Sequence, residues 1–232
     1  YETRSQKLKL QLDYSNYNLN YKDDPVGYRS RTDNAFGASV FYQFWPKTAL
    51  FAEYDLALIE FDSGSLYDNT EHRYFGGVIW EVTAKTRGQF KVGFTDKNFD
   101  SSSITDQEDF SLEVQTQHNL TPKRALQINA YRRFHESDLA GASSFLSTGI
   151  DVGVLQRFTE KWSGTLNLFY EINDYNEVNR EDDYYGIIPA IRFKPKKWLF
   201  FDLGYGHYNN DSNDATYDYE TNQILLRATA TM

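Results

Sequence analysis

The sequence predicts an all-β fold, an antiparallel up-and-down barrel of about twelve strands, because a lysine-centred tetrad recurs along it at a nearly fixed interval. The tetrads are WPKT at 45–48, TAKT at 83–86, TPKR at 121–124, TEKW at 159–162 and KPKK at 194–197, and their central lysines lie 38, 38, 38 and 35 residues apart. Two runs of alternating apolar and polar residues lie between consecutive tetrads, separated by a stretch rich in Asp, Asn, Ser and Gly. Each interval is therefore one β-hairpin. Tight turns then fall at one end of the sheet and long loops at the other, which is typical of an outer-membrane barrel.

The alternating runs define the individual strands. One face of the runs is consistently apolar, as in Leu8, Leu10, Leu12 and Tyr14, and we assign this face to lipid. Each run is long enough to cross a bilayer with the usual tilt. In chain order, the predicted strands are 7–20, 32–44, 48–61, 70–83, 87–99, 106–119, 124–134, 144–158, 163–174, 183–193, 198–209 and 219–231.

The opposite face of these strands is polar and predicts the lining of a lumen. Amide, acidic and basic residues occur on it together, and a lumen of mixed sign favours weak ion selectivity because opposite charges pair across it. The alternative is that these side chains only solvate the lumen or pair with one another. The candidates are Gln11, Glu53, Asp55, Arg73, Lys91, Glu113, Asn129, Tyr131, Arg133, Asp151, Asn167, Glu171, Arg192, Asp202 and Arg227.

Alternation alone does not separate a barrel from a soluble sandwich with its apolar face inside. Three features favour the barrel: strands longer than the usual five to six or so residues, the hairpin interval, and a last strand that reaches the end of the chain. Aromatic residues make up 17% of the 232 residues, as in barrels with interfacial aromatic girdles. The mean hydropathy of −0.65 is compatible with a barrel because alternation hides its apolar face. We therefore predict a single barrel domain over 1–232.

Two strands carry further expectations. The last places Ile224, Leu226, Ala228, Ala230 and Met232 on one face, and in a closed barrel it pairs with the first strand. Pro189 interrupts an apolar stretch of the strand at 183–193. Because proline cannot donate a ladder hydrogen bond, we expect a bulge or a local break there and not the loss of the strand.

The net charge of −9 is unevenly distributed, since the tight turns are basic and the long loops acidic. We place the turns in the periplasm and the loops outside a bacterial outer membrane. The acidic loops make nucleic acid an improbable partner; they could gather divalent cations beside lipopolysaccharide, or form a plain solvated surface. The acidic loop residues are Asp23, Asp24, Asp62, Asp68, Asp100, Asp106, Glu108, Asp109, Glu136, Asp138, Asp174, Glu177, Glu181, Asp182, Asp183, Asp211, Asp214 and Asp218.

Patterns of catalytic or metal-binding residues are weak. The four histidines fall in different hairpins, and cysteine is absent, so we predict no metal, no cofactor and no catalytic residue. His135 with Glu136 at a loop entrance, and the carboxylates Glu53 and Asp55 on one strand face, would be the places for hydrolase chemistry. Acidic runs at 106–109 and 181–183 could bind calcium but lack the glycine of an EF-hand loop.

Four segments carry a family resemblance: KTALFAEYD at 47–55, TAKTRGQFKVGFTDKNFD at 83–100, NDYNEVNREDDYY at 173–185 and LGYGHYNNDSNDATYDYETNQI at 203–224. In order and spacing they resemble the outer-membrane β-barrel porin family of exopolysaccharide loci, including EpsL-type proteins. The resemblance implies a barrel that passes a polysaccharide across the outer membrane together with a periplasmic polysaccharide-export protein. Family members usually carry further strands before this region. Because the chain begins at Tyr1 without an apolar signal segment, we expect a processed product or a fragment, compatible with the C-terminal part of a larger barrel.

Other readings remain open at this point. A general or small-solute diffusion porin would share the fold, although no predicted loop is long enough for an elaborate constriction. An outer-membrane hydrolase would place its active site at the loop end. A soluble sandwich or adhesive module would stay in solution without detergent.

Overall fold

All twelve predicted strands form in the structure, a computed structural model that describes residues 7–22, 30–62, 66–83 and 85–231. One short 3₁₀ helix, η1 (Ala215–Tyr217), precedes the last strand, and no helix within these ranges is long and apolar enough to cross a membrane. The strands are β1 (Leu8–Leu19), β2 (Arg31–Trp45), β3 (Thr48–Phe61), β4 (Asn69–Thr83), β5 (Thr86–Phe99), β6 (Gln107–Thr121), β7 (Arg124–Glu136), β8 (Ser144–Arg157), β9 (Trp162–Tyr175), β10 (Arg180–Lys196), β11 (Leu199–Ser212) and β12 (Tyr219–Ala230).

The strands make one antiparallel sheet whose order follows the chain from β1 to β12. This confirms the predicted up-and-down meander. The predicted boundaries differ from the observed ones by at most three residues, as in β10, which spans 180–196 where 183–193 was predicted. Most observed strands are slightly longer than the predicted ones, because their ladders continue to the edge of each turn.

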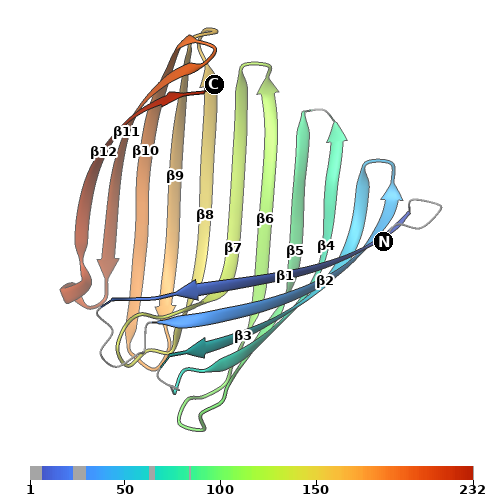
Figure 1. The fold of residues 1–232 in the computed structure, drawn as a ribbon, viewed down its shortest axis with the longest axis vertical. Coiled ribbons are helices and arrows are strands. Elements are labelled where there is room, and N and C mark those ends of the chain that lie inside the picture. The colour runs from blue at the N-terminus through green and yellow to red at the C-terminus, as the bar shows by residue number, and fades with distance from the viewer. Residues whose placement is uncertain (1–6, 23–29, 63–65, 84, 232) are drawn as a thin grey trace.

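The sheet curls strongly along its length. Figure 1 shows β1, β2 and β3 passing across the front of the central strands, so that the N-terminal end of the sheet covers one face of the rest. The prediction that the last strand pairs with the first is not met, since no ladder joins β1 to β12 within the described ranges. Met232, predicted on the apolar face of β12, lies outside those ranges.

The two faces of the sheet differ in chemistry. The convex face carries exposed apolar side chains, including Leu12, Ile224 and Leu226, which are 72%, 75% and 77% exposed. Among the described residues, buried polar and charged side chains outnumber buried apolar ones, so the interior of the curl is polar. A soluble sandwich buries its apolar face. Here the apolar face is exposed and the interior is polar, which is typical of a sheet whose convex face contacts lipid.

Pro189 leaves β10 continuous but interrupts one of its ladders. Towards β9 the pairing runs unbroken through Pro189 and Leu166. Towards β11 the pairs at Ile188 and Pro189 are missing, and the same register resumes at Ala190. The expected local break is therefore present, but no bulge forms, because losing one donor does not require inserting a residue.

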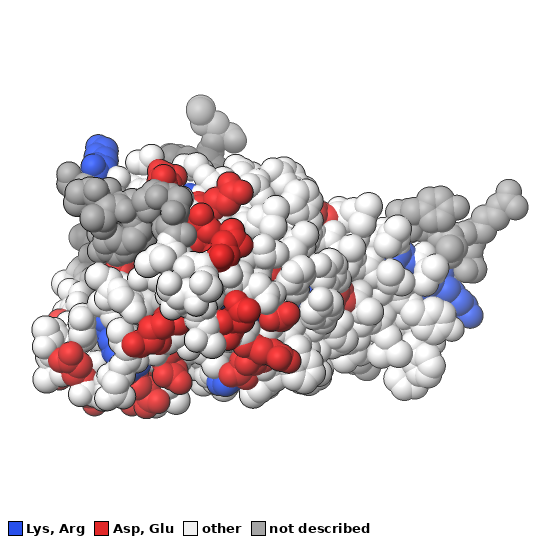
Figure 2. All heavy atoms as spheres, turned by 90° about the horizontal axis from the view of Figure 1, so that it is seen from below, with Lys and Arg blue, Asp and Glu red and all other residues white. Residues whose placement is uncertain are grey.

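Acidic side chains of the long loops accept hydrogen bonds from backbone N–H groups at the ends of the strands. The Asp68 carboxylate accepts a hydrogen bond from Phe61 N (2.7 Å), Asp106 accepts one from Phe99 N (2.9 Å), and Asp218 accepts one from Ser212 N (2.8 Å). A further hydrogen bond from the backbone of Thr216 lowers the pKa of Asp214 at the start of η1. Figure 2, seen from the loop end, shows Asp and Glu gathered there and few Lys or Arg. Asp23 and Asp24, also predicted in this acidic set, lie outside the described residues.

Candidate functional site: the concave face

All fifteen residues predicted to line a lumen lie on the concave face of the sheet. The strand registers place them there, because directly paired residues share a face. One row of partners shows this: it runs from β2 to β10 through Phe41, Phe51, Gly77, Lys91, Glu113, Tyr131, Gly149, Glu171 and Tyr184. The predicted residues of the remaining strands follow the same alternation.

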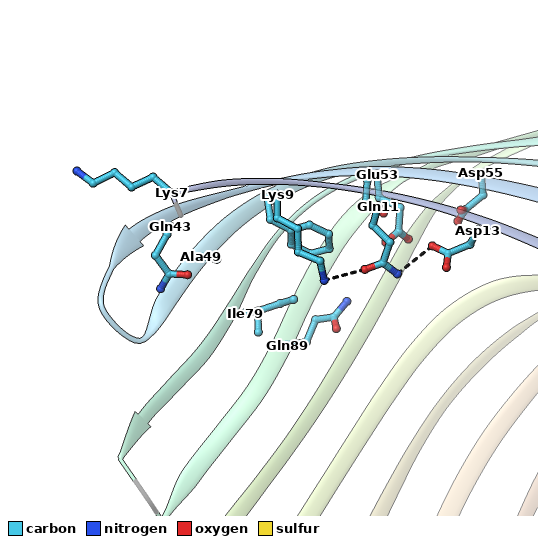
Figure 3. Close-up of a pocket in the computed structure, with 12 residues that line it drawn as sticks. Lys7, Lys9, Gln11, Asp13, Gln43, Ala49, Glu53, Asp55, Ile79 and Gln89 are labelled. Atoms are coloured by element: carbon cyan, nitrogen blue, oxygen red, sulfur yellow. Dashed lines mark hydrogen bonds between the residues drawn. The ribbon is translucent and has the colours of Figure 1, made fainter. Parts of the chain in front are cut away.

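A cavity of about 710 Å³ lies where β1, β2 and β3 curl over β4 and β5. Its wall is mostly polar and includes Gln11, Glu53 and Asp55 from the predicted set. On β1, Lys9 Nζ donates to Gln11 Oε1 (3.1 Å), and Gln11 Nε2 donates to an Asp13 carboxylate oxygen (2.9 Å). Figure 3 shows these side chains pointing from β1 towards Gln89 and Ile79 beneath. The cavity therefore offers hydrogen-bonding groups to an aqueous solute.

Lys91 is the centre of an ion-pair cluster on this face. Its Nζ lies 2.6 Å from Glu53 Oε1 on β3 and 3.3 Å from Glu113 Oε2 on β6. The ammonium also lies 4.2 Å from the ring centroid of Phe75. The structure thus brings together three of the predicted residues, two acidic and one basic, and the cluster keeps one excess negative charge.

Replacing Lys91 by methionine is expected to make any ion current through this face more cation-selective. The variant removes one positive charge and leaves Glu53 and Glu113 without their shared partner. We expect the potassium-to-chloride permeability ratio, measured from the reversal potential in a salt gradient, to rise about two-fold or more. Glu113→Gln is the matched control and should lower the potassium-to-chloride permeability ratio. Equal reversal potentials in all three proteins would place the cluster outside the ion path.

A second cluster closes the loop end of the concave face and was missed by sequence analysis. Lys97 on β5 is fully buried and pairs with Glu136 on β7; its Nζ also lies 2.9 Å from Asn69 Oδ1 and 3.5 Å from Glu71 Oε2. Lys97 and Glu71 occupy polar-face positions of the predicted strands, so alternation could have included them. Their burial could not be read from the sequence, because β6 separates β5 from β7 in the sheet.

The short loop between β7 and β8 packs beside this cluster. Ser143 N and Oγ both donate to a Glu177 carboxylate oxygen (2.8 and 2.7 Å), and Ser144 Oγ donates to Gln107 Oε1 (2.5 Å). Ala142, Ser143 and Ser144 are buried. Hydrogen bonds to β6 and to the loop after β9 therefore hold this seven-residue loop and the start of β8 in place.

The other predicted residues form smaller groups. The hydroxyl of Tyr131 donates to Glu171, and Arg192 pairs with Asp202 (Nε to Oδ1, 2.5 Å). Arg227 is the register partner of Asp202 on β12. Arg73 joins the Lys97 cluster through Glu71 (Nε to Oε1, 3.3 Å), and the Arg133 guanidinium lies 4.8 Å from the ring centroid of Tyr131. The structure brings the remaining three predicted residues into none of the clusters above; they are Asn129, Asp151 and Asn167.

The residues considered for catalysis or metal binding have structural partners. His135 stacks on Phe145 with ring centroids 5.2 Å apart, and Glu136 is paired with Lys97. Glu53 pairs with Lys91, and in the acidic run at 181–183 Asp182 pairs with Arg180. Within the described part of the chain, no group of three or more His, Asp or Glu side chains is arranged to hold a metal ion.

A membrane-type sheet with an apolar convex face and a polar concave face defines the class of outer-membrane β-barrel proteins. The chain belongs to one family of this class, described as "Putative beta-barrel porin 2", whose model matches residues 2–232. This membership agrees with the family resemblance at the level of a porin. No curated protein matches the sequence significantly.

Several solved structures align with the chain at low sequence identity. The FrpB iron transporter from Neisseria meningitidis (F3-3 variant) aligns with a TM-score of 0.59 at 9% identity, over 92% of this chain and 40% of that one. OmpT, an outer-membrane protein of Vibrio cholerae, aligns with a TM-score of 0.41 at 9% identity, over 97% of this chain and 92% of that one. The TodX monoaromatic hydrocarbon channel (deltaS2 mutant) aligns with a TM-score of 0.41 at 11% identity, over 97% of this chain and 79% of that one. The chain thus spans two fifths of the transporter, and at these identities the likeness concerns the fold alone.

Proposed function

We propose that this porin-family chain is a non-enzymatic conduit that carries a polysaccharide across the bacterial outer membrane. The observation that supports the proposal is the concave face, where amides, carboxylates and basic groups line the curl from β1 to β12. A hydroxyl-rich chain can exchange its hydrogen bonds with water for hydrogen bonds with such a wall. Because the charges are largely paired, as at Lys91, the wall has no deep single-sign site to trap it.

A band of neutral amides near the turn end supports the same proposal. Gln89, Gln115 and Asn129 are register partners on β5, β6 and β7, and Gln117 and Gln127 form the next row. These amides line a cavity of about 440 Å³, with Glu81 and Arg87 at its wall. An amide both donates and accepts, as does a sugar hydroxyl, so the band favours a neutral glycan over a simple ion.

The distribution of tryptophan and charge supports an orientation and partners for the conduit. All four tryptophans, Trp45, Trp80, Trp162 and Trp198, lie near tight turns, where the basic tetrads also fall. Aromatic and basic residues suit the headgroup level of a membrane, so we place this end in the periplasm, within reach of a polysaccharide-export protein. The acidic loop end then faces lipopolysaccharide outside.

Conductance measurements test the proposal. The full chain, folded in detergent and inserted into a planar bilayer, is expected to form a weakly ion-selective pore. Neutral maltooligosaccharides should block it more strongly as their length increases, and should be recovered uncleaved. Block that is independent of length would favour a small-solute diffusion porin, and cleavage of the sugars would favour a hydrolase. Either result, or the absence of conductance, would overturn the conduit.

A further inference from the structure

Four aromatic rings gather on the concave face of β9 to β12, near the loop end. Phe169 and Tyr208 are both register partners of Gly186, and Tyr184 and Tyr219 are both partners of Asn210. Phe169 lies 4.9 Å from Tyr184 and 6.0 Å from Tyr208 between ring centroids. Tyr184 lies 6.4 Å from Tyr208, at an interplanar angle of 13°, and 6.4 Å from Tyr219. The rings therefore lie side by side on one face of the sheet.

Glycines allow two of these rings to lie close against the backbone. A Cβ atom at Gly186 would lie 2.6 Å from Cε1 of Phe169, and one at Gly206 would lie 2.6 Å from Cε2 of Tyr208. Each ring thus occupies the space that a side chain would need. Both rings therefore lie close to the backbone of β10 and β11 on the concave side. The partial exposure of Phe169, Tyr184 and Tyr208 agrees with this geometry.

Hydrogen-bonding groups border the rings. Glu171, the register partner of Tyr184, accepts a hydrogen bond from Asn173 Nδ2 (2.8 Å). The Oδ1 atom of Asn173 is buried and has no hydrogen-bond partner within the described structure. Buried polar atoms are usually satisfied, and an exception calls for a ligand or an ordered water. Because this oxygen is enclosed by protein, the group at the border of the rings that a ligand can reach is the Glu171 carboxylate.

We propose that Phe169, Tyr184, Tyr208 and Tyr219 form a platform on which pyranose rings of the transported glycan stack. This inference rests on the proposed function, because it requires the concave face to line the glycan path. The C–H face of a sugar ring packs on an aromatic face, while the hydroxyls at its rim need polar partners such as the Glu171 carboxylate. A purely apolar ligand would leave those groups unpaired. A nucleic acid could also stack, but the acidic loop end repels its phosphates.

Block by maltohexaose in single-channel recordings tests the platform. The variant Tyr184→Ala/Tyr208→Ala is expected to raise the half-blocking concentration about ten-fold, through shorter blocking events. Tyr184→Phe/Tyr208→Phe keeps both rings and should block like the wild type. The matched control is Tyr170→Ala/Tyr185→Ala, which removes two exposed tyrosines from the convex face of β9 and β10 and should leave the block unchanged.

The outcomes separate the two proposals. If maltohexaose does not block the wild-type pore, the conduit itself fails, and the platform with it. If the wild type is blocked and the double alanine variant is blocked equally, the conduit stands and the platform is overturned. Heat-dependent migration on gels verifies that each variant is folded, and titration of the folded proteins with maltohexaose by calorimetry provides a readout that does not depend on conductance.

Discussion

Replacing Gly93 by alanine is expected to cost about 3 kcal/mol of folding free energy or more, the upper part of the range for overpacking. Gly93 on β5 pairs with Phe75 on β4. A Cβ atom at Gly93 would lie 1.7 Å from the carbonyl oxygen of Tyr74 and 2.9 Å from Cα of Phe75. Because both obstacles are backbone atoms, no rotamer change can relieve the clash, and the two strands must separate locally. Urea unfolding of the protein in lipid vesicles, followed by tryptophan fluorescence, measures the loss.

Gly76 provides the matched control on the neighbouring strand. A Cβ atom there would meet no atom within 4 Å. Gly76→Ala should therefore be neutral or stabilise the protein by up to about 1 kcal/mol, since alanine lowers the entropy of the unfolded chain. Equal unfolding midpoints for the two variants would show that β4 and β5 do not approach as closely at Gly93 as the structure has them.

The strands and their order could be predicted from the sequence because both depend on local information. Alternation sets the face of each residue, and the Lys-centred turns set the hairpin boundaries, so a central strand such as β3 was predicted with the observed limits, 48–61. Pro189 was assigned to a strand for the same reason, since apolar residues flank it on both sides, and its missing donor interrupts the pairing only towards β11. Closure of the sheet is different: it depends on the accumulated twist and tilt of twelve strands, which no local pattern encodes.

The sequence predicted which residues of the candidate site share a face of the sheet, but not which of them are in contact. Alternation placed Lys91, Glu53 and Glu113 on one face, and the curl of the sheet then brought their charges together. The same alternation did not reveal that Lys97 on β5 reaches Glu136 on β7, because this depends on curvature and side-chain length. The aromatic platform was also missed. Its signal in the sequence is a glycine such as Gly186, which registers with Phe169 only once the strand pairing is known.

Replacing Lys97 by methionine is expected to destabilise the protein by about 3–5 kcal/mol, the cost of breaking a buried ion pair from one side. The methionine side chain fills a similar volume, so the loss arises from charge and not from a cavity. Glu136, which is 5% exposed, would then lose its cation, while Glu71, which is 9% exposed, would keep Arg73 (Nε to Oε1, 3.3 Å). Lys123→Met in an exposed turn is the control for loss of a lysine elsewhere and should change stability by less than about 0.5 kcal/mol.

A double-mutant cycle separates the ion pair from other effects at this site. Glu136→Gln removes the stranded carboxylate, so Lys97→Met/Glu136→Gln should be more stable than Lys97→Met alone. The coupling between the two positions is expected to reach about 1–3 kcal/mol, read from urea midpoints in lipid vesicles. Additive losses would mean that Lys97 and Glu136 are not paired in the folded protein. A strong coupling would instead show that this buried pair links β5 to β7 across β6 in the folded protein, and that the charges at the loop end of the concave face contribute to stability through their pairing.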